Sequence, residues 1–182
     1  MKAKRKGTLV ITGEVRASYA NIWEPKSING SDPKFSISLL IPKDDTDTIQ
    51  AIEEAIAQAK EDHKGKWNGK VPANLKTPLR DGDEEREDDP SYENCYFINA
   101  NSTTAPQIVD AYKNKLTDST AVYSGCYIRA SINFYGFNTN GNKGIAAGLG
   151  NIQKVRDGEM LAGGTTAADD FDELDMDDDD II

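Results

Sequence analysis

The sequence contains few of the residues that build metal sites and nucleophilic active sites. Its 182 residues include one histidine, His63, and two cysteines, Cys95 and Cys126, which do not form a CxxC pair. One imidazole and two distant thiols are too few for the usual zinc sites, and they favour free cysteines in a reducing compartment. A catalytic triad also needs an imidazole next to its nucleophile, and His63 stands among helical signals. We therefore expect no catalytic residues, no metal and no cofactor.

Long apolar runs are missing as well. No stretch approaches the ~20 apolar residues that span a bilayer, and the basic start of the chain is followed by a strand-like segment, not by the apolar region of a signal peptide. There is no GxxxxGK[ST] phosphate loop. A run from Asp81 imitates a calcium loop but has Arg86 in place of the glycine at its sixth position. We expect a cytoplasmic protein without a membrane segment.

Charge is unevenly distributed along the chain. Lys and Arg number 21 against 31 Asp and Glu, a net charge of −10. Residues 169–182 hold nine acids and no base, so residues 1–168 carry 21 bases against 22 acids. A second acidic run, at 80–89, holds seven acids and two bases. The distribution predicts a mildly basic body with two acidic segments.

The apolar patterns predict a mainly β protein with one or two helices. Alternating or short apolar runs are predicted as strands at 8–19, 34–41, 95–100, 121–137 and 144–155. Ile49, Ile52, Ile56 and Ala59 form one stripe of an α-helix, which begins after the acidic residues at 44–47 and ends near Gly65. Turn-forming residues predict a loop at 20–33 and a hairpin at 138–142, and residues 108–116 favour a turn or two of helix.

One domain with two appended segments is the predicted organisation. Residues 1–156 are expected to form the domain, from which 65–94 projects as a long excursion because it has no sustained period. Residues 157–168 are rich in glycine, threonine and alanine, which is typical of a flexible linker. Residues 169–182 have too little apolar area to fold, so they are predicted to be a disordered acidic tail.

The predicted strand 121–137 has two faces of different character. Its even-numbered residues from Cys126 to Phe134 are small or apolar and are predicted to face the core. The opposite face carries rings and polar groups in place of ordinary surface residues: Tyr123, Tyr127, Arg129, Asn133, Tyr135 and Phe137. Rings next to cations suit nucleobase stacking with phosphate contacts. Alternatively, these rings pack under 65–94 or against a second subunit in a homodimer.

The acidic tail imitates a single strand of nucleic acid, because closely spaced negative charges alternate with apolar groups. A tethered segment of this kind would compete for the basic face and, once displaced, would recruit partner proteins. The alternative is that the tail only keeps the protein soluble. The residues assigned to the partner-binding role are Asp169, Asp170, Phe171, Asp177, Asp178, Asp179, Asp180, Ile181 and Ile182.

Several segments match a known sequence pattern. The most specific run, Gly125 to Tyr135, is GCYIRASINFY, and Asn151 to Gly158 adds NIQKVRDG. Segments 13–19, 23–25 and 34–42 and the acidic terminus also match. Together, over most of the chain, these segments resemble a family of single-stranded-DNA-binding proteins of tailed phages.

The resemblance implies an OB-fold, a small five-stranded barrel that binds single strands on one face. It also implies a role in phage DNA replication and recombination in the bacterial host, and a tail that modulates DNA binding and contacts replication proteins. The predicted helix follows the second recognisable strand, whereas the common OB arrangement places it after the third. Either a variant topology or a further strand within 20–33 is therefore expected.

These observations predict a non-enzymatic binder of single-stranded DNA with little sequence preference. The expected stacking rings are Tyr19, Trp23, Tyr123, Tyr127, Tyr135 and Phe137. The expected phosphate contacts are Arg16, Lys34, Arg129, Lys143, Lys154 and Arg156. The alternatives are an RNA or duplex-DNA ligand, a protein-interaction scaffold without a nucleic-acid role, and a magnesium-dependent nuclease.

Overall fold

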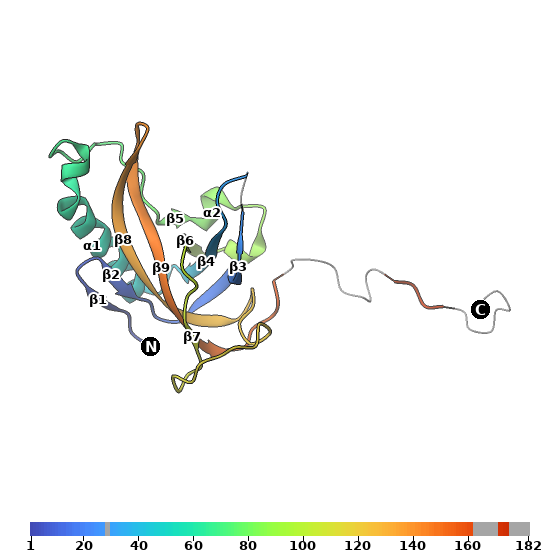
Figure 1. Ribbon diagram of the computed structural model, residues 1–182. Coiled ribbons are helices and arrows are strands. Elements are labelled where there is room, and N and C mark those ends of the chain that lie inside the picture. The colour runs from blue at the N-terminus through green and yellow to red at the C-terminus, as the bar shows by residue number, and fades with distance from the viewer. Residues whose placement is uncertain (28–29, 162–170, 175–182) are drawn as a thin grey trace.

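Five strands close into a barrel in the computed structural model, which describes residues 1–27, 30–161 and 171–174. The barrel strands are β3 (Val15–Lys26), β4 (Lys34–Pro42), β6 (Cys95–Ser102), β8 (Tyr127–Thr139) and β9 (Asn142–Arg156). They follow one another around the ring as β3, β4, β6, β9 and β8, and β8 pairs with β3 again (Figure 1). Only β6 and β9 run parallel among these ring pairs. This is the predicted OB-type barrel.

Short elements surround the barrel. They are β1 (Lys4–Lys6), β2 (Leu9–Ile11), α1 (Thr46–Asp62), the 3-10 helix η1 (Lys64–Trp67), β5 (Arg80–Asp81), α2 (Gly82–Glu85), the 3-10 helix η2 (Pro90–Tyr92) and β7 (Ile108–Val109). β1 and β2 extend the sheet beside β8, and β7 pairs with β9. No helix in the described part of the chain has both the length and the apolar character of a membrane span.

Helix α1 confirms both the predicted helix and the variant topology. The Asp45 side chain accepts a hydrogen bond from the Thr48 amide at 3.1 Å and so caps the first turn. Ile52, Ile56 and Ala59 of the predicted stripe are buried in the core, and Ile49 is partly buried against it. The helix connects the second and third barrel strands. Residues 20–26 form no extra strand, because they continue β3.

The β8–β9 hairpin follows the predicted alternation closely. Ile128, Ile132 and Phe134 are fully buried. The two strands are joined by Asn140 and Gly141, whose φ values of 51° and 86° are both positive. Two left-handed residues in a two-residue loop form the type I′ turn that matches the twist of the strands.

Two predicted strands have different limits in the structure. The alternating segment 8–19 is interrupted between β2 and β3, because the Gly13 amide donates to Thr48 Oγ1 and the Thr12 hydroxyl accepts from Ala130, which ties this point to α1 and β8. The long strand begins at Tyr127 and not at 121. Gly125, at φ +116°, turns the chain before it and donates to the Ala17 carbonyl. Tyr123 therefore lies in a turn.

The predicted helical turn at 108–116 is wrong. Ile108 and Val109 form β7, and residues 110–115 form a tight turn held by the Asp110 carboxylate, which accepts from the Tyr112 and Asn114 amides. A side chain that bonds its own loop competes with helix formation. The short apolar pattern therefore belongs to a strand.

The segment 65–94 packs on the barrel and does not project from it. Trp67 and Tyr92 are 3% and 0% exposed. The Tyr92 hydroxyl lies 3.1 Å from Ser18 Oγ and 3.2 Å from Ser38 Oγ, and its ring contacts Phe97 edge to face at 5.2 Å. Tyr92, Phe97 and Leu40 form a second small core on the outer surface of β4 and β6. The excursion thus covers part of the barrel wall.

Candidate nucleic-acid interface

Tyr127 lies between two guanidinium groups on the outer face of the barrel. It pairs with Arg16 on β3 and with Arg156 on β9. Arg156 Cζ is 3.7 Å and Arg16 Cζ is 5.6 Å from the centre of the Tyr127 ring. These are cation–π distances. We call these three residues the Tyr127 cluster.

The cations of the Tyr127 cluster are already engaged. Arg16 donates to the Gly125 carbonyl at 3.0 Å and to the Glu159 carbonyl at 2.6 Å. Arg156 Nε lies 2.6 Å from Glu14 Oε1, and this hydrogen bond raises the pKa of Arg156. The guanidinium groups are therefore held in place, and a phosphate that approaches Arg156 competes with the Glu14 carboxylate.

Tyr123 and Lys154 form a similar pair at the end of β9. Lys154 Nζ is 5.6 Å from the centre of the Tyr123 ring and 2.6 Å from Asp157 Oδ1. The Tyr123 hydroxyl donates to Asp157 Oδ1 at 3.1 Å and lies 3.0 Å from the Gly158 carbonyl oxygen. The hydrogen bonds from Lys154 and Tyr123 hold the pKa of Asp157 below its usual range.

The first residues of the predicted linker are docked on the barrel. The Leu161 amide donates to the Ser124 carbonyl at 2.9 Å, and the Leu161 side chain packs against the second core of Leu40, Tyr92 and Phe97. Phe171 and Leu174 are 74% and 75% exposed. The other residues predicted to bind partners lie outside the described residues: Asp169, Asp170, Asp177, Asp178, Asp179, Asp180, Ile181 and Ile182.

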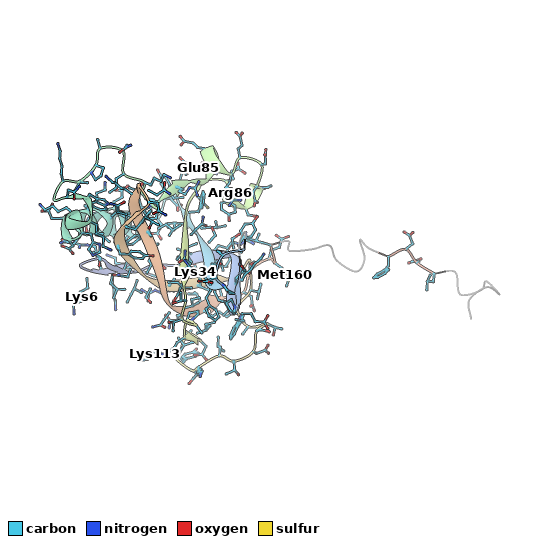
Figure 2. The ribbon with its side chains drawn as sticks, turned by 45° about the horizontal axis from the view of Figure 1, so that its top comes forward. Lys6, Lys34, Glu85, Arg86, Lys113 and Met160 are labelled. Carbon is cyan, nitrogen blue, oxygen red and sulfur yellow. The ribbon has the colours of Figure 1, made fainter. Side chains whose placement is uncertain are left out.

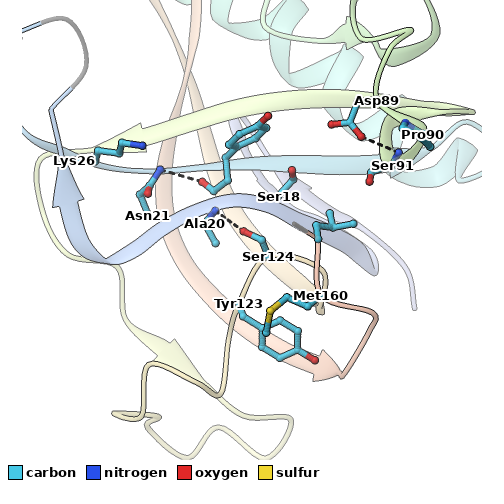
Figure 3. A pocket seen from close by; sticks show the side chains of 12 residues that line it. Ser18, Ala20, Asn21, Lys26, Asp89, Pro90, Ser91, Tyr123, Ser124 and Met160 are labelled. Atoms are coloured by element: carbon cyan, nitrogen blue, oxygen red, sulfur yellow. Dashed lines mark hydrogen bonds between the residues drawn. The ribbon is translucent and has the colours of Figure 1, made fainter. Parts of the chain in front are cut away.

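A groove of about 690 Å³ lies between β3, residues 89–91, the turn before β8 and the docked linker (Figure 3). Its walls carry Tyr19, Lys26, Tyr123 and Met160, among others. Tyr19 is 57% exposed, and its φ of 45° falls where the pairing of β3 with β4 shifts register. A bulge of this kind redirects a side chain. Lys34 is exposed at the start of β4 and pairs with Lys26 at the end of β3.

The remaining predicted rings of the hairpin, Tyr135 and Phe137, lie close to glycines of β9. A Cβ on Gly148 would lie 3.5 Å from the Tyr135 ring, and one on Gly144 would lie 2.8 Å from Phe137. Both rings are half-buried on the outer side of β8 and β9, and Lys143 follows them toward the hairpin turn. Tyr135, Phe137 and Lys143 lie near the hairpin turn, whereas the Tyr127 cluster lies at the opposite end of the β8–β9 pair.

Two predicted contacts have structural partners of their own. Trp23 is half-buried and donates from Nε1 to the Val122 carbonyl at 2.9 Å. Arg129 donates to the carbonyls of Thr12 at 2.9 Å and Lys2 at 3.0 Å. Arg129 thus fastens the N-terminal segment to β8. Its DNA contact remains a prediction, as does that of Trp23.

Arg86 is a candidate that the sequence did not indicate. It lies in the acidic run, at the rim of the molecule in Figure 2. Its Cζ is 5.7 Å from the centre of the Tyr19 ring, 5.3 Å from that of Tyr92 and 5.7 Å from that of Phe97. Only the presence of a base among seven acids marked it in the sequence, because 65–94 has no regular period.

The described residues hold no group of three or more His, Cys, Asp or Glu side chains placed to bind a metal ion. Both cysteines are free, and burial raises the pKa of each thiol. A raised thiol pKa lowers the thiolate fraction and hence the reactivity of these cysteines.

Comparisons with known proteins show which family this chain belongs to. The family described as "Enterobacter phage Enc34, ssDNA-binding protein" matches residues 8–182. Protein p50 of Acyrthosiphon pisum secondary endosymbiont phage 1 is 32% identical over 174 residues, which cover 89% of this chain and 91% of p50.

Solved structures show the same fold. The single-stranded DNA-binding protein of bacteriophage Enc34 in complex with ssDNA is 28% identical, with a TM-score of 0.77 over 86% of this chain and 91% of that one. The single-stranded DNA binding protein of bacteriophage T7 is 17% identical, with a TM-score of 0.58 over 91% of this chain and 98% of that one. At this lower identity the likeness concerns the fold alone.

Proposed function

Because the chain belongs to the family of the Enterobacter phage Enc34 single-stranded-DNA-binding protein, we propose that it binds single-stranded DNA in phage replication and recombination. The observation that carries the proposal is that rings and cations gather along one groove and the adjoining outer wall of an OB barrel. The protein acts in the cytoplasm of the host bacterium, by binding and not by catalysis.

In this proposal, aromatic rings bind the bases and lysines bind the backbone phosphates. Bases stack on Tyr19, Tyr123 and Tyr127, and because every base has a π-face, the preference for sequence is small. The planar Arg156 guanidinium already lies on Tyr127, so it extends the stacking surface. The backbone phosphates lie toward the lysines at the end of β3 and β4, Lys26 and Lys34, and toward Lys143.

The acidic tail modulates this binding. The docked segment 157–161 ends at the edge of the groove, and the acidic residues 169–182 follow it in the sequence. A nearby segment with nine acids raises the local concentration of a competitor for the cations. DNA displaces the tail, which is then free to contact replication proteins. A homodimer through the rings of β8 remains a prediction.

Fluorescence anisotropy with labelled dT oligomers of graded length, at two salt concentrations, tests the proposal. We expect saturable binding that weakens with salt, and weaker binding of duplex DNA of the same length. Unlabelled duplex DNA and unlabelled oligo-U RNA of the same length are then used as competitors of the labelled dT oligomer. Preferred binding of RNA or of duplex DNA, magnesium-dependent cleavage, or the absence of binding at micromolar protein would contradict it.

A further inference from the structure

Arg86 has an unusual environment for an arginine in an acidic segment. Seven of the nine residues from Asp81 to Asp89 are acids, yet the Arg86 side chain forms no ion pair within the described residues. Instead, its guanidinium lies over three aromatic rings from three different elements: Tyr19 of β3, Tyr92 of η2 and Phe97 of β6.

Two of these rings form a fixed floor. Tyr92 and Phe97 are both fully buried, contact each other edge to face, and are anchored by the two hydrogen bonds of the Tyr92 hydroxyl. The backbone of Arg86 is also fixed, because its amide donates to the Gly82 carbonyl at 2.9 Å. Arg86 therefore connects a rigid part of the wall to the third ring, Tyr19, which is mostly exposed.

Tyr19 lies between two hollows, which also share Asp89 and Pro90. It lines the groove that also holds Lys26 and Tyr123, and it lines a second hollow of about 430 Å³. Arg86 lines the second of these hollows and not the groove, and the acids beside it there are Glu84, Glu85, Glu87, Asp88 and Asp89. Tyr19 thus contacts the guanidinium on the acidic side and presents ring surface to the groove.

We propose that Arg86 is a positioning residue of the DNA site, which fixes Tyr19 so that the groove side of its ring stacks on a nucleobase of single-stranded DNA. The proposal rests on the proposed function. A ring that is held before binding loses less freedom when a base stacks on it. The redirected backbone at Tyr19 and the rings beneath Arg86 serve the same placement.

A double-mutant cycle tests this inference, with the affinity for a dT oligomer measured by anisotropy. We expect Tyr19→Ala and Arg86→Ala each to weaken binding about fivefold or more, which is the lower range for one stacked base. The double variant should bind no worse than Tyr19→Ala alone, because Arg86 acts through Tyr19. The salt dependence of binding should be the same for Arg86→Ala and the wild type.

Arg80→Ala is the matched control. Arg80 lies in the same segment and over the same Phe97 ring, at 5.4 Å, but has no contact with Tyr19 in the described residues. The Arg80→Ala substitution removes the same charge as Arg86→Ala but leaves Tyr19 in place, so we expect the affinity for dT to change less than twofold. Additive effects of the Tyr19 and Arg86 variants, or an Arg80→Ala loss as large as that of Arg86→Ala, would overturn the proposal. A flatter salt dependence in Arg86→Ala would also overturn it, since it would indicate a direct phosphate contact.

Folding and the proposed function are checked separately. If circular dichroism shows that Arg86→Ala is unfolded, Arg86→Met, which keeps an unbranched apolar stem without the guanidinium, is measured instead. Wild-type affinity in folded Arg86→Met would refute the role of Arg86. Failure of the wild-type protein to bind dT would refute the proposed function itself, which distinguishes the two results.

Discussion

Tyr92 offers the strongest test of how 65–94 is attached to the barrel. Truncation to alanine removes a fully buried ring together with its contact to Phe97, and large-to-small changes of this kind cost about 3–5 kcal/mol. Tyr92→Phe keeps the ring but removes the hydroxyl that lies 3.1 and 3.2 Å from Ser18 and Ser38. Each buried hydrogen bond contributes about 1 kcal/mol, so we expect a loss of about 1–2 kcal/mol.

The free energy of unfolding, from urea titrations followed by circular dichroism, measures these losses. Tyr112→Ala is the matched control, because Tyr112 is 84% exposed and its truncation is expected to cost less than about 0.5 kcal/mol. We also expect Tyr92→Ala to weaken DNA binding, since Arg86 lies over this ring and over that of Tyr19. A loss below about 1 kcal/mol in Tyr92→Ala would refute the docking of the segment on the barrel.

Three further predictions concern the site, the tail and one loop. Tyr127→Ala should weaken dT binding about fivefold or more without moving the urea midpoint, and wild-type affinity would show that the Tyr127 cluster is not part of the site. Removal of 169–182 should tighten binding and raise the association rate at low salt, as stopped-flow fluorescence would show, whereas unchanged or weaker binding would exclude competition by the tail. The Asn114 amide, with that of Tyr112, lowers the pKa of Asp110. Because the folded pKa lies below the unfolded one, this carboxylate stabilises the fold above about pH 4 and the effect is lost as the pH falls through the folded pKa. The stability of Asp110→Ala should therefore depend less on pH in acid than that of the wild type, and equal slopes would contradict this.

The strongly periodic parts of the fold follow from the sequence. The helix stripe at 49–59 and the even-numbered core positions of β8 predict burial correctly, because each pattern repeats over several turns or residues. The hairpin at Asn140 and Gly141 is equally local, since two residues that tolerate positive φ determine the turn. The helix and the two long barrel strands can therefore be predicted from local patterns alone.

The rest depends on contacts between segments that are far apart in sequence. The burial of Tyr92 requires Ser18 and Ser38 from two other strands, and no periodicity near residue 92 reports them. The same holds for Arg86, whose three rings come from three elements. Periodicity finds faces of single elements, whereas the site is assembled by tertiary packing. Arg129 shows the converse, since its place on the aromatic face did not reveal its bonds to two backbone carbonyls.

These internal partners lead to a last prediction, on the salt dependence of binding. If all six predicted phosphate contacts neutralised a phosphate, the logarithm of the binding constant would fall with the logarithm of salt with a slope of about −4. Four of them have partners in the protein: Arg16 and Arg129 bond carbonyls, Lys154 pairs with Asp157, and Arg156 pairs with Glu14. When a phosphate replaces a carboxylate at Lys154 or Arg156, the freed carboxylate takes up counterions again, so the net release is small. The N–H groups of Arg16 and Arg129 that hold backbone carbonyls are not free to bind a phosphate.

We therefore expect a slope nearer −2, carried mainly by Lys34, Lys143 and Lys26, which form no ion pair within the described residues. Glu14→Gln keeps the size of the side chain but removes the competing charge at Arg156. It should tighten dT binding at low salt and steepen the slope by up to about 0.7, whereas Glu54→Gln, which pairs with Arg5 away from the Tyr127 cluster, should leave the slope unchanged. A wild-type slope near −4 would contradict the argument, because it would mean that the internal pairs do not compete with DNA.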